Sequence, residues 1–315
     1  MATTEVQNEV FRRVLKLMGN RFEISVVEND SFAAGQHIDA AVNEIRRIEK
    51  LLTTFSDDSQ TNLINHNAGI QPVRVDEEVF NLVDRSLKIS KLTQGSFDIT
   101  YGSIDKRLWN FDVNMKDLPD KETAKQSVKL INFKNVLLDY EKGTVFLKEK
   151  GMRIGFGGIG KGYAADMAKN ILKERGVKSG IVNAAGDLVT WGTQPNGKPW
   201  TIGIANPNNS LAAFSSLNIS DMAIATSGNY EKYALINGKK YSHTIDPKTG
   251  LPVFGIKSVS IICPSAELAD AMATPVMVMG VKVGLNLINQ LPKIACLVID
   301  DNDNIYHSKN INIKQ

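Results

Sequence analysis

The chain has 315 residues, which is enough for one large domain or two smaller ones with a buried core. Its 43% hydrophobic and 23% charged residues are typical of an ordinary soluble globular protein. The net charge is +3, from 37 basic and 34 acidic residues, and this balance argues against a surface for nucleic acid or for a membrane.

No apolar stretch approaches the roughly 20 residues that a bilayer span requires, so we expect no membrane span. Residues 1–22 carry charges throughout and lack the continuous apolar region of a signal peptide. The sequence as written therefore favours a cytoplasmic location. The alternative is a periplasmic or membrane-anchored location, if an export signal has been removed. Cys263 and Cys296 lie in apolar runs and are expected to be buried free thiols.

The first third of the chain predicts a strand followed by two helices. Residues 22–27 alternate in polarity and are β-branched, which is typical of a strand. Apolar residues recur at helical spacing over residues 38–52. A second helix is indicated over residues 76–95, where Asp76 is the expected N-cap and Gly95 lies just beyond the end.

The remainder of the chain interleaves strands with two further helices. Strands are expected within residues 135–157, joined by a hairpin turn at 141–143, and a helix is expected over residues 161–176. Three short apolar stretches follow, at residues 179–187, 200–206 and 222–228. A helix is expected to begin near Ser265, and a final strand is expected over residues 293–300.

Strands and helices are interspersed without a strict β-α-β-α alternation, so we predict an α+β fold rather than a doubly wound parallel sheet. No linker rich in Pro, Gly or Ser divides the chain. We therefore expect one continuous domain over residues 1–315, with residues 1–17 as an N-terminal extension.

The stretch RIGFGGIGKGYAADMAK, residues 153–169, places five glycines before a predicted helix. It fits G-x-G-x-x-G formally, but Asp187 follows a glycine instead of ending the next strand as a dinucleotide site requires. Glycines let a backbone approach a ligand, a helix N-terminus offers N–H groups to phosphate, and Lys161 adds a positive charge. The structural alternative is a tight strand-to-helix corner.

The stretch ADAMATP places Asp270 and Thr274 four residues apart, on one face of a helix. A carboxylate and a hydroxyl suit a hard cation such as Mg²⁺. The alternative is a solvated aspartate beside a threonine that packs its methyl group. Pro275 removes one helical hydrogen bond and is expected to bend the helix.

Aromatic residues gather in residues 93–111, where they predict either a stacking pocket for a planar ring or part of the core; they are Phe97, Tyr101, Trp109 and Phe111. Asp98 lies between apolar neighbours. A carboxylate in such a place needs a hydrogen-bonding partner.

Residues 241–250, YSHTIDPKTG, combine a histidine with strong turn residues. His243 would lie where a strand enters the turn, at a partly exposed edge. Histidine titrates near neutral pH, so it can accept or donate a proton there. A structural histidine in a loop is the alternative.

Six motifs occur in order along the chain: GSFDIT, GFGGIGKGYAAD, NAAGDL, ATSGNYEKY, YSHTIDPKTGLPV and ADAMAT. Together they resemble the ApbE family of FAD:protein FMN transferases, from about Met18 to the final strand. The resemblance implies a single mixed fold of sheets packed with helices and a flavin cleft between sub-regions. It also implies an enzyme that splits FAD at its diphosphate and transfers FMN to a threonine hydroxyl of a target protein, releasing AMP. Mg²⁺ is the implied metal.

The resemblance also assigns roles to single residues. His243 matches the histidine of H-x-x-D-P-x-T-G and would deprotonate the incoming threonine. Asp270 and Thr274 match the side-chain metal ligands, and Gly158 matches a backbone carbonyl ligand. The implied contacts to FAD are Met18, Phe55, Ser96, Phe97, Asp98, Lys161 and Thr244.

The chain departs from the family pattern at two positions. Gly155 stands where many members have Asp, and Ala185 replaces the first glycine of G-G-D. Two other functions remain open on the same motifs: an Mg²⁺-dependent FAD pyrophosphatase that releases free FMN and AMP, and a non-catalytic FAD-binding protein.

Overall fold

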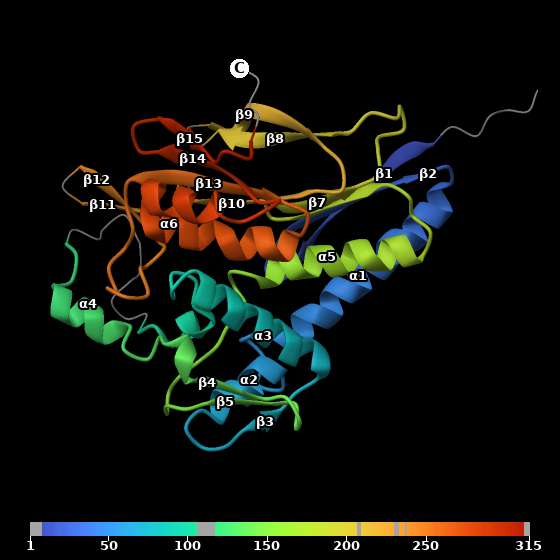
Figure 1. The fold of residues 1–315 in the computed structure, drawn as a ribbon. Helices are drawn as coiled ribbons and strands as arrows, with labels where there is room; N and C mark the ends of the chain where they lie inside the picture. Colours follow the sequence, from blue (N-terminus) through green and yellow to red (C-terminus); the bar gives the residue numbers. More distant parts are fainter. Residues whose placement is uncertain (1–7, 106–116, 207–208, 230–232, 237, 312–315) are drawn as a thin grey trace, which may run out of the picture. The chain divides into compact units, whose positions relative to one another are not determined.

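The computed structural model describes residues 8–105, 117–206, 209–229, 233–236 and 238–311. The described residues form six α-helices and fifteen strands (Figure 1), so the predicted α+β fold class is confirmed. Trp109 and Phe111, half of the predicted aromatic cluster, lie outside the described residues.

The chain divides into two compact units. The first consists of Met1–Glu49, Gly160–Thr226 and Ser260–Asp270. The second consists of Lys50–Ile159, Ser227–Val259 and Ala271–Gln315. The expectation of one continuous domain stays a prediction.

Five strands of the first unit lie side by side, and each is antiparallel to the next; in spatial order they are β1 (Glu9–Leu17), β2 (Asn20–Glu28), β6 (Gly180–Ala184), β7 (Asp187–Trp191) and β10 (Ala223–Gly228). The predicted strand over residues 22–27 lies within β2. Residues 9–17, expected as part of an extension, form β1 and pair with β2 along its whole length. A separate hairpin consists of β8 (Trp200–Asn206) and β9 (Asn209–Ile219).

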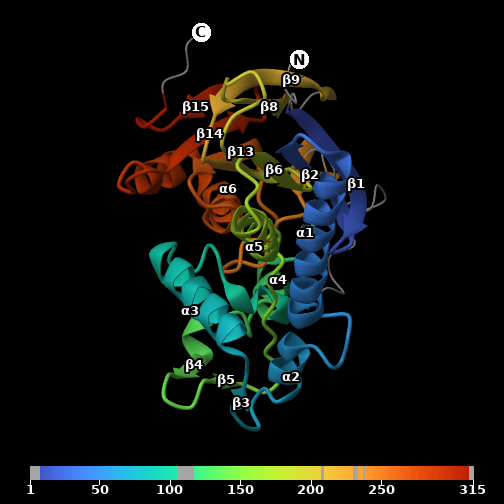
Figure 2. The same ribbon diagram turned by 90° about the vertical axis from the view of Figure 1, so that its right-hand side faces the viewer.

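Two helices accompany this sheet, α1 (Ser31–Leu52) and α5 (Gly160–Glu174). In Figures 1 and 2 α1 runs beside β1 and β2. An ion pair between Arg13 and Asp39 and a contact between His37 and Glu28 connect them. α5 packs on β6 and β7. The helical spacing predicted over residues 38–52 is confirmed, because its apolar positions are all buried.

The second unit contains a small antiparallel sheet in the order β3 (Val73–Arg74), β5 (Thr144–Leu147), β4 (Val136–Asp139). The predicted hairpin turn at residues 141–143 joins β4 to β5, which confirms it. The helices of this unit are α2 (Gln60–His66), α3 (Glu77–Leu92), α4 (Lys121–Ser127) and the 3-10 turns η1 (Ile99–Ser103) and η3 (Phe133–Asn135).

The N-cap prediction at α3 is half right. Asp76 occupies the N-cap position, but its side chain makes no capping hydrogen bond. Its backbone N–H donates to Oε1 of Gln60 instead, at 2.8 Å. Gly95 follows the helix with a φ of +79°, as its place beyond the end predicts.

The C-terminal part of the chain adds a hairpin, three neighbouring strands and one long helix. The hairpin pairs β11 (Tyr233–Ile236) with β12 (Lys239–Ser242). The three strands are β13 (Ile256–Cys263), β14 (Ala295–Asp300) and β15 (Ile305–His307). The strand predicted over residues 293–300 is β14, but it is not the last one, since β15 pairs with it antiparallel.

The long helix α6 (Ala266–Ile288) carries both predicted metal-binding side chains. By length and composition alone, it is the one helix of the described chain that could cross a membrane, and this does not conflict with the expectation of no membrane span. Its first half is largely buried, as in a core helix. The backbone leaves the helical conformation at Gly280 (φ 79°), beyond Pro275.

Candidate active site

Three charged side chains from three elements meet in the first unit: Lys161 in the first turn of α5, Asp187 at the start of β7, and Asp270 in α6. The Nζ atom of Lys161 lies 2.7 Å from Oδ2 of Asp187 and 3.4 Å from both carboxylate oxygens of Asp270. Oδ2 of Asp270 also accepts a hydrogen bond of 3.1 Å from the backbone N–H of Gly162. Two carboxylates therefore share one ammonium group.

A close helix contact explains how these residues meet. A Cβ atom at Gly162 would lie 2.1 Å from the carbonyl oxygen of Ala266, so only glycine permits this approach of α5 to the start of α6. Asp166, one turn later on α5, fixes the same contact. Its Oδ2 atom accepts hydrogen bonds from Oγ of Ser265 and from the backbone N–H of Glu267, at 2.8 and 3.0 Å.

Burial governs the charge states of this cluster. Burial, together with the nearby carboxylate of Asp270, raises the pKa of Asp187 to about 7, and Lys161 opposes that rise. Burial disfavours the charge on Lys161, but the two carboxylates outweigh it and raise the pKa of that ammonium. Lys161 is therefore charged at neutral pH.

Asp187 was missed as a candidate by the sequence analysis. Its motif, NAAGDL, contributes to the family resemblance, and Asp187 does not lie where a dinucleotide site requires its acidic residue. A buried carboxylate directly after a two-residue turn was the available signal, because such a group needs a cationic partner. Nothing local indicated that Lys161 would be that partner.

Met18 lies at the same end of the sheet as Asp187. Met18 and Gly19 form the two-residue turn between β1 and β2, and both have positive φ, 49° and 72°. Ala185 and Gly186 form the equivalent turn between β6 and β7. The two turns are neighbours, since the backbone N–H of Ala185 donates to the carbonyl of Arg21 at 3.0 Å. The first unit thus gathers Met18, Asp187, Lys161 and Asp270 in one region.

In the second unit, His243 follows directly after β12 and is exposed, as its sequence position predicts. The turn after it is firmly held. The backbone N–H of Gly250 donates to the carbonyl of Asp246 at 2.9 Å, and a Cβ at Gly250 would lie 1.9 Å from the carbonyl oxygen of Ala124. The turn that follows His243 is therefore closed by a hydrogen bond and packed against Ala124.

One hydrogen bond connects this turn to the segment that carries Ser96, Phe97 and Asp98. The backbone N–H of Ile245 donates to the hydroxyl of Tyr101 at 3.2 Å. The ring of Phe97 lies beside Gly158, 3.5 Å from the place that a Cβ atom would take at that glycine. Within the second unit, Phe97 and Gly158 are therefore neighbours, and the turn after His243 is tied to η1.

Asp98 has the partners that its apolar surroundings require. Oδ1 accepts hydrogen bonds from the backbone N–H and the hydroxyl of Thr100, at 2.8 and 2.6 Å. Oδ2 accepts one from the backbone N–H of Phe133, at 2.9 Å. Burial raises the pKa of Asp98, and these hydrogen bonds oppose the rise. Within the described structure the carboxylate therefore joins η1 to η3.

Phe55 lies on a loop whose backbone is pinned by side chains of α2. The amide Nδ2 of Asn62 donates to the carbonyls of Thr54 and Ser56, at 3.0 and 2.9 Å. Ser59 caps α2 by accepting from the backbone N–H of Asn62. The phenyl ring of Phe55 is nevertheless 99% exposed.

The predicted metal-binding residues offer only oxygen, the ligand type that Mg²⁺ prefers. Thr274 is partly exposed, and its hydroxyl lies 3.0 Å from that of Ser227. The carboxylate of Asp270 faces the ammonium of Lys161, which lies where a metal cation would contact that carboxylate. In the described part of the chain, no group of three or more His, Cys, Asp or Glu could hold a metal. Oxygen donors of this kind suit an ion that completes its shell with water or phosphate oxygens.

The two departures from the family pattern have different structural consequences. At Gly155 a Cβ atom would meet only a methyl carbon of Thr54, at 4.0 Å, so the site has room for a side chain. At Ala185 the φ of 56° belongs to the left-handed region, which favours glycine.

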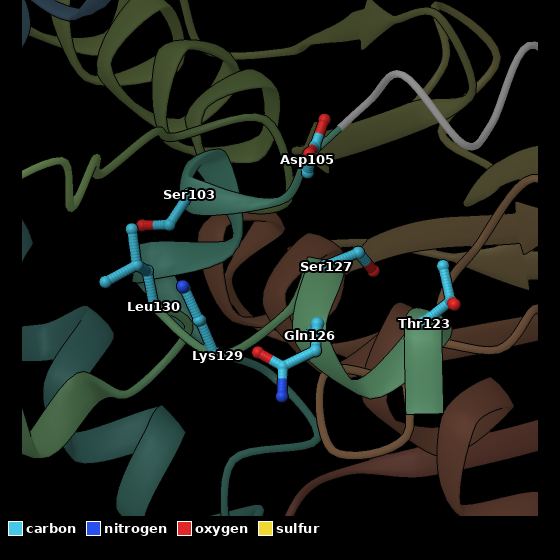
Figure 3. Close-up of a pocket in the computed structure, with 7 residues that line it drawn as sticks. All are labelled: Ser103, Asp105, Thr123, Gln126, Ser127, Lys129 and Leu130. Atoms are coloured by element: carbon cyan, nitrogen blue, oxygen red, sulfur yellow. The ribbon is translucent and has the colours of Figure 1, made fainter. Parts of the chain in front are cut away.

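A separate cavity of about 630 Å³ lies in the second unit (Figure 3). Its described lining residues come from η1 and the segment after it and from α4 and the residues that follow: Ser103, Asp105, Thr123, Gln126, Ser127, Lys129 and Leu130. The predicted flavin, metal and base residues are not among them. Ser103 is engaged with the backbone of Arg153, and Ser127 with that of Ala124.

Comparison with known proteins gives a consistent result. The model of the ApbE family matches residues 18–298. A relative from Klebsiella pneumoniae, an FAD:protein FMN transferase, is 30% identical over 300 residues, which cover 95% of this chain and 92% of the relative. Another FAD:protein FMN transferase, from Escherichia coli K12, is 28% identical over 84% of this chain and 77% of its own.

Solved structures agree with these sequence matches. The ApbE protein of Thermotoga maritima is 29% identical and aligns with a TM-score of 0.85 over 96% of this chain and 97% of its own. The apo flavinyl transferase ApbE of Pseudomonas stutzeri is 26% identical, with a TM-score of 0.84 over 98% and 97%.

Proposed function

Since the chain belongs to the ApbE family and is a flavin transferase, we propose that it uses Mg²⁺ to move FMN from FAD to a threonine hydroxyl of a target protein, with release of AMP. One observation carries the proposal. The family match over residues 18–298 includes all of the residues predicted for base, metal and flavin, among them His243, Asp270 and Thr274.

His243 is the proposed general base. In the proposed reaction the imidazole takes the proton of the acceptor threonine, whose oxygen attacks the phosphorus of the FMN part. A new P–O bond forms, the P–O bond to AMP breaks, and AMP leaves with the electron pair. The exposed position of His243 supports this role, because a base must reach an incoming protein.

The carboxylate of Asp270, the hydroxyl of Thr274 and the backbone carbonyl of Gly158 are the proposed metal ligands. When bound, Mg²⁺ neutralises charge on the diphosphate and on the leaving group. Lys161 supplies a further positive charge for the phosphates. The proposed contacts to FAD are Met18, Phe55, Ser96, Phe97, Asp98 and Thr244, and the exposed ring of Phe55 supports stacking against the flavin.

The deciding experiment is mass spectrometry of a candidate acceptor protein after incubation with this chain, FAD and Mg²⁺. We expect an added FMN mass on a threonine and one AMP per label. Free FMN and AMP without labelled protein would indicate the pyrophosphatase instead. Bound FAD with no AMP under any metal condition would indicate a non-catalytic flavin-binding protein.

The role of His243 is tested by His243→Ala in the same assay. We expect transfer to fall by 10²–10⁴-fold or more, the usual contribution of a general base. FAD affinity, measured by fluorescence quenching, should stay within a few-fold of the unaltered chain. Loss of both transfer and FAD binding would assign His243 a structural role.

A further inference from the structure

We propose that Asp187 is a positioning residue for the metal site: it holds the Lys161 ammonium off Asp270, so that the Asp270 carboxylate can bind a divalent cation. The inference rests on the proposed function, which assigns Asp270 to the metal. It gives a role to a buried carboxylate that the proposed reaction does not use.

The distances from the Lys161 ammonium to the two carboxylates differ in the direction that this role of Asp187 requires. The ammonium of Lys161 lies 2.7 Å from Asp187, within the range of a charge-assisted hydrogen bond, and 3.4 Å from each oxygen of Asp270. Lys161 is therefore paired more closely with Asp187, although it also contacts both oxygens of Asp270. The backbone N–H of Thr226 also donates to Asp187, which holds that carboxylate in place.

Burial makes the pairing of Lys161 with an anion energetically important. The side chains of Asp187 and Asp270 are each 7% exposed, and that of Lys161 is 24% exposed. An ammonium in such a place is costly when it has no anionic partner. Any cation that binds Asp270 must leave Lys161 with an anion, and Asp187 is that anion.

Charge counting points the same way. When both carboxylates are ionised, they and the ammonium carry a net charge of −1, so one negative charge remains for an incoming ion. Replacing Asp187 with a neutral residue makes the sum zero. Lys161 would then turn fully to Asp270, and a divalent ion would have to displace a buried ammonium and leave it unpaired.

The test measures metal binding directly, by the loss of the free Mn²⁺ electron paramagnetic resonance signal, with Mn²⁺ alone as the probe. We expect Asp187→Asn to weaken Mn²⁺ binding by at least 10-fold, as removal of an outer-shell partner usually does. The charge-conserving Asp187→Glu should recover most of the affinity. Asp221→Asn is the matched control, because Asp221 is exposed and its φ of 55° suits asparagine. The Mn²⁺ affinity of this control variant should not change.

The dependence on Lys161 separates positioning from a general field effect. With Lys161→Met already present, the ammonium is gone, and adding Asp187→Asn should change Mn²⁺ affinity by less than about 3-fold. Compared with the 10-fold loss in the unaltered background, this is an interaction energy of about 0.7 kcal/mol or more between the two sites. An equal loss in both backgrounds would overturn the inference, and so would unchanged affinity in Asp187→Asn. Thermal unfolding of each variant confirms that it is folded.

The inference and the proposed function fail in different ways. If the unaltered chain and the control bind Mn²⁺ but Asp187→Asn binds it equally well, only the role of Asp187 is wrong. If the unaltered chain does not bind Mn²⁺ at all, the metal ligands of the proposed function are wrong, and the inference falls with them.

Discussion

The phenyl ring of Phe55 is 99% exposed on a loop whose backbone is hydrogen-bonded to Asn62. Such a side chain contributes little to the folded state, and covering it with a ligand would remove apolar area from water. We therefore predict that Phe55→Ala leaves the unfolding midpoint unchanged and weakens FAD binding by about 10-fold or more, from about 1.5–3 kcal/mol of lost burial. Leu63→Ala, another exposed apolar side chain, is the control. Equal FAD affinity in Phe55→Ala would exclude this contact.

Asp98, unlike Phe55, is expected to stabilise the folded state, because all three of its hydrogen bonds are internal to the second unit. An amide at this position has one acceptor oxygen, and its NH₂ group would face an N–H or O–H donor. We predict that Asp98→Asn lowers the free energy of unfolding by about 1–3 kcal/mol, measured by urea denaturation. A change below about 0.5 kcal/mol would show that the carboxylate is not needed to join η1 to η3.

At the level of elements, the turn between β6 and β7 has a residue type that does not suit its backbone conformation. Ala185 has a φ of 56°, in the region where a side chain costs about 1 kcal/mol, and Asp187 follows two residues later. We predict that Ala185→Gly raises the free energy of unfolding by about 1 kcal/mol. The control is Ala184→Gly, within β6, which should lower it by about 0.5–1 kcal/mol. If both variants raised the free energy of unfolding, or both lowered it, this interpretation of the turn would be contradicted.

The contact of α5 with α6 shows how elements assemble the charged cluster. Gly162 removes the side chain that would collide with Ala266, and Asp166 caps the first turn of α6. Lys161 and Asp270 face each other because the two helices approach so closely. The glycine-rich stretch enters α5 from a turn and not from a strand, so the strand-to-helix corner of the structural alternative is not observed. Its Gly162 instead allows the helix contact that brings Lys161 to Asp270.

For the whole molecule, ligand linkage gives the most accessible measurement. A ligand that binds only the folded chain stabilises it by about 2.7 kcal/mol at 100 times its Kd. We predict that FAD with Mg²⁺ raises Tm by on the order of 5 °C. His243→Ala should show the full rise, because a general base is not needed for binding. Asp270→Ala should lose the increment that Mg²⁺ adds; an undiminished increment would exclude Asp270 as a ligand.

Much of the architecture could be predicted from local patterns. Helical spacing identified α1 and α5, and turn residues identified the β4–β5 hairpin and the rigid turn after His243. β1 and β15 were missed. β1 is an edge strand with an exposed outer surface, and β15 has only three residues, so neither has the apolar run that marks a buried strand.

The sequence by itself determined the family and the fold class and predicted the residues for the chemistry, because motif order, periodicity and turn chemistry are properties of neighbouring residues. Only the tertiary structure decided which of those residues touch. Lys161 and Asp270 are 109 positions apart, and their shared partner Asp187 opens a strand between them in the chain. Their pairing depends on a close approach of backbones and on the exclusion of water, and neither is encoded in any single segment.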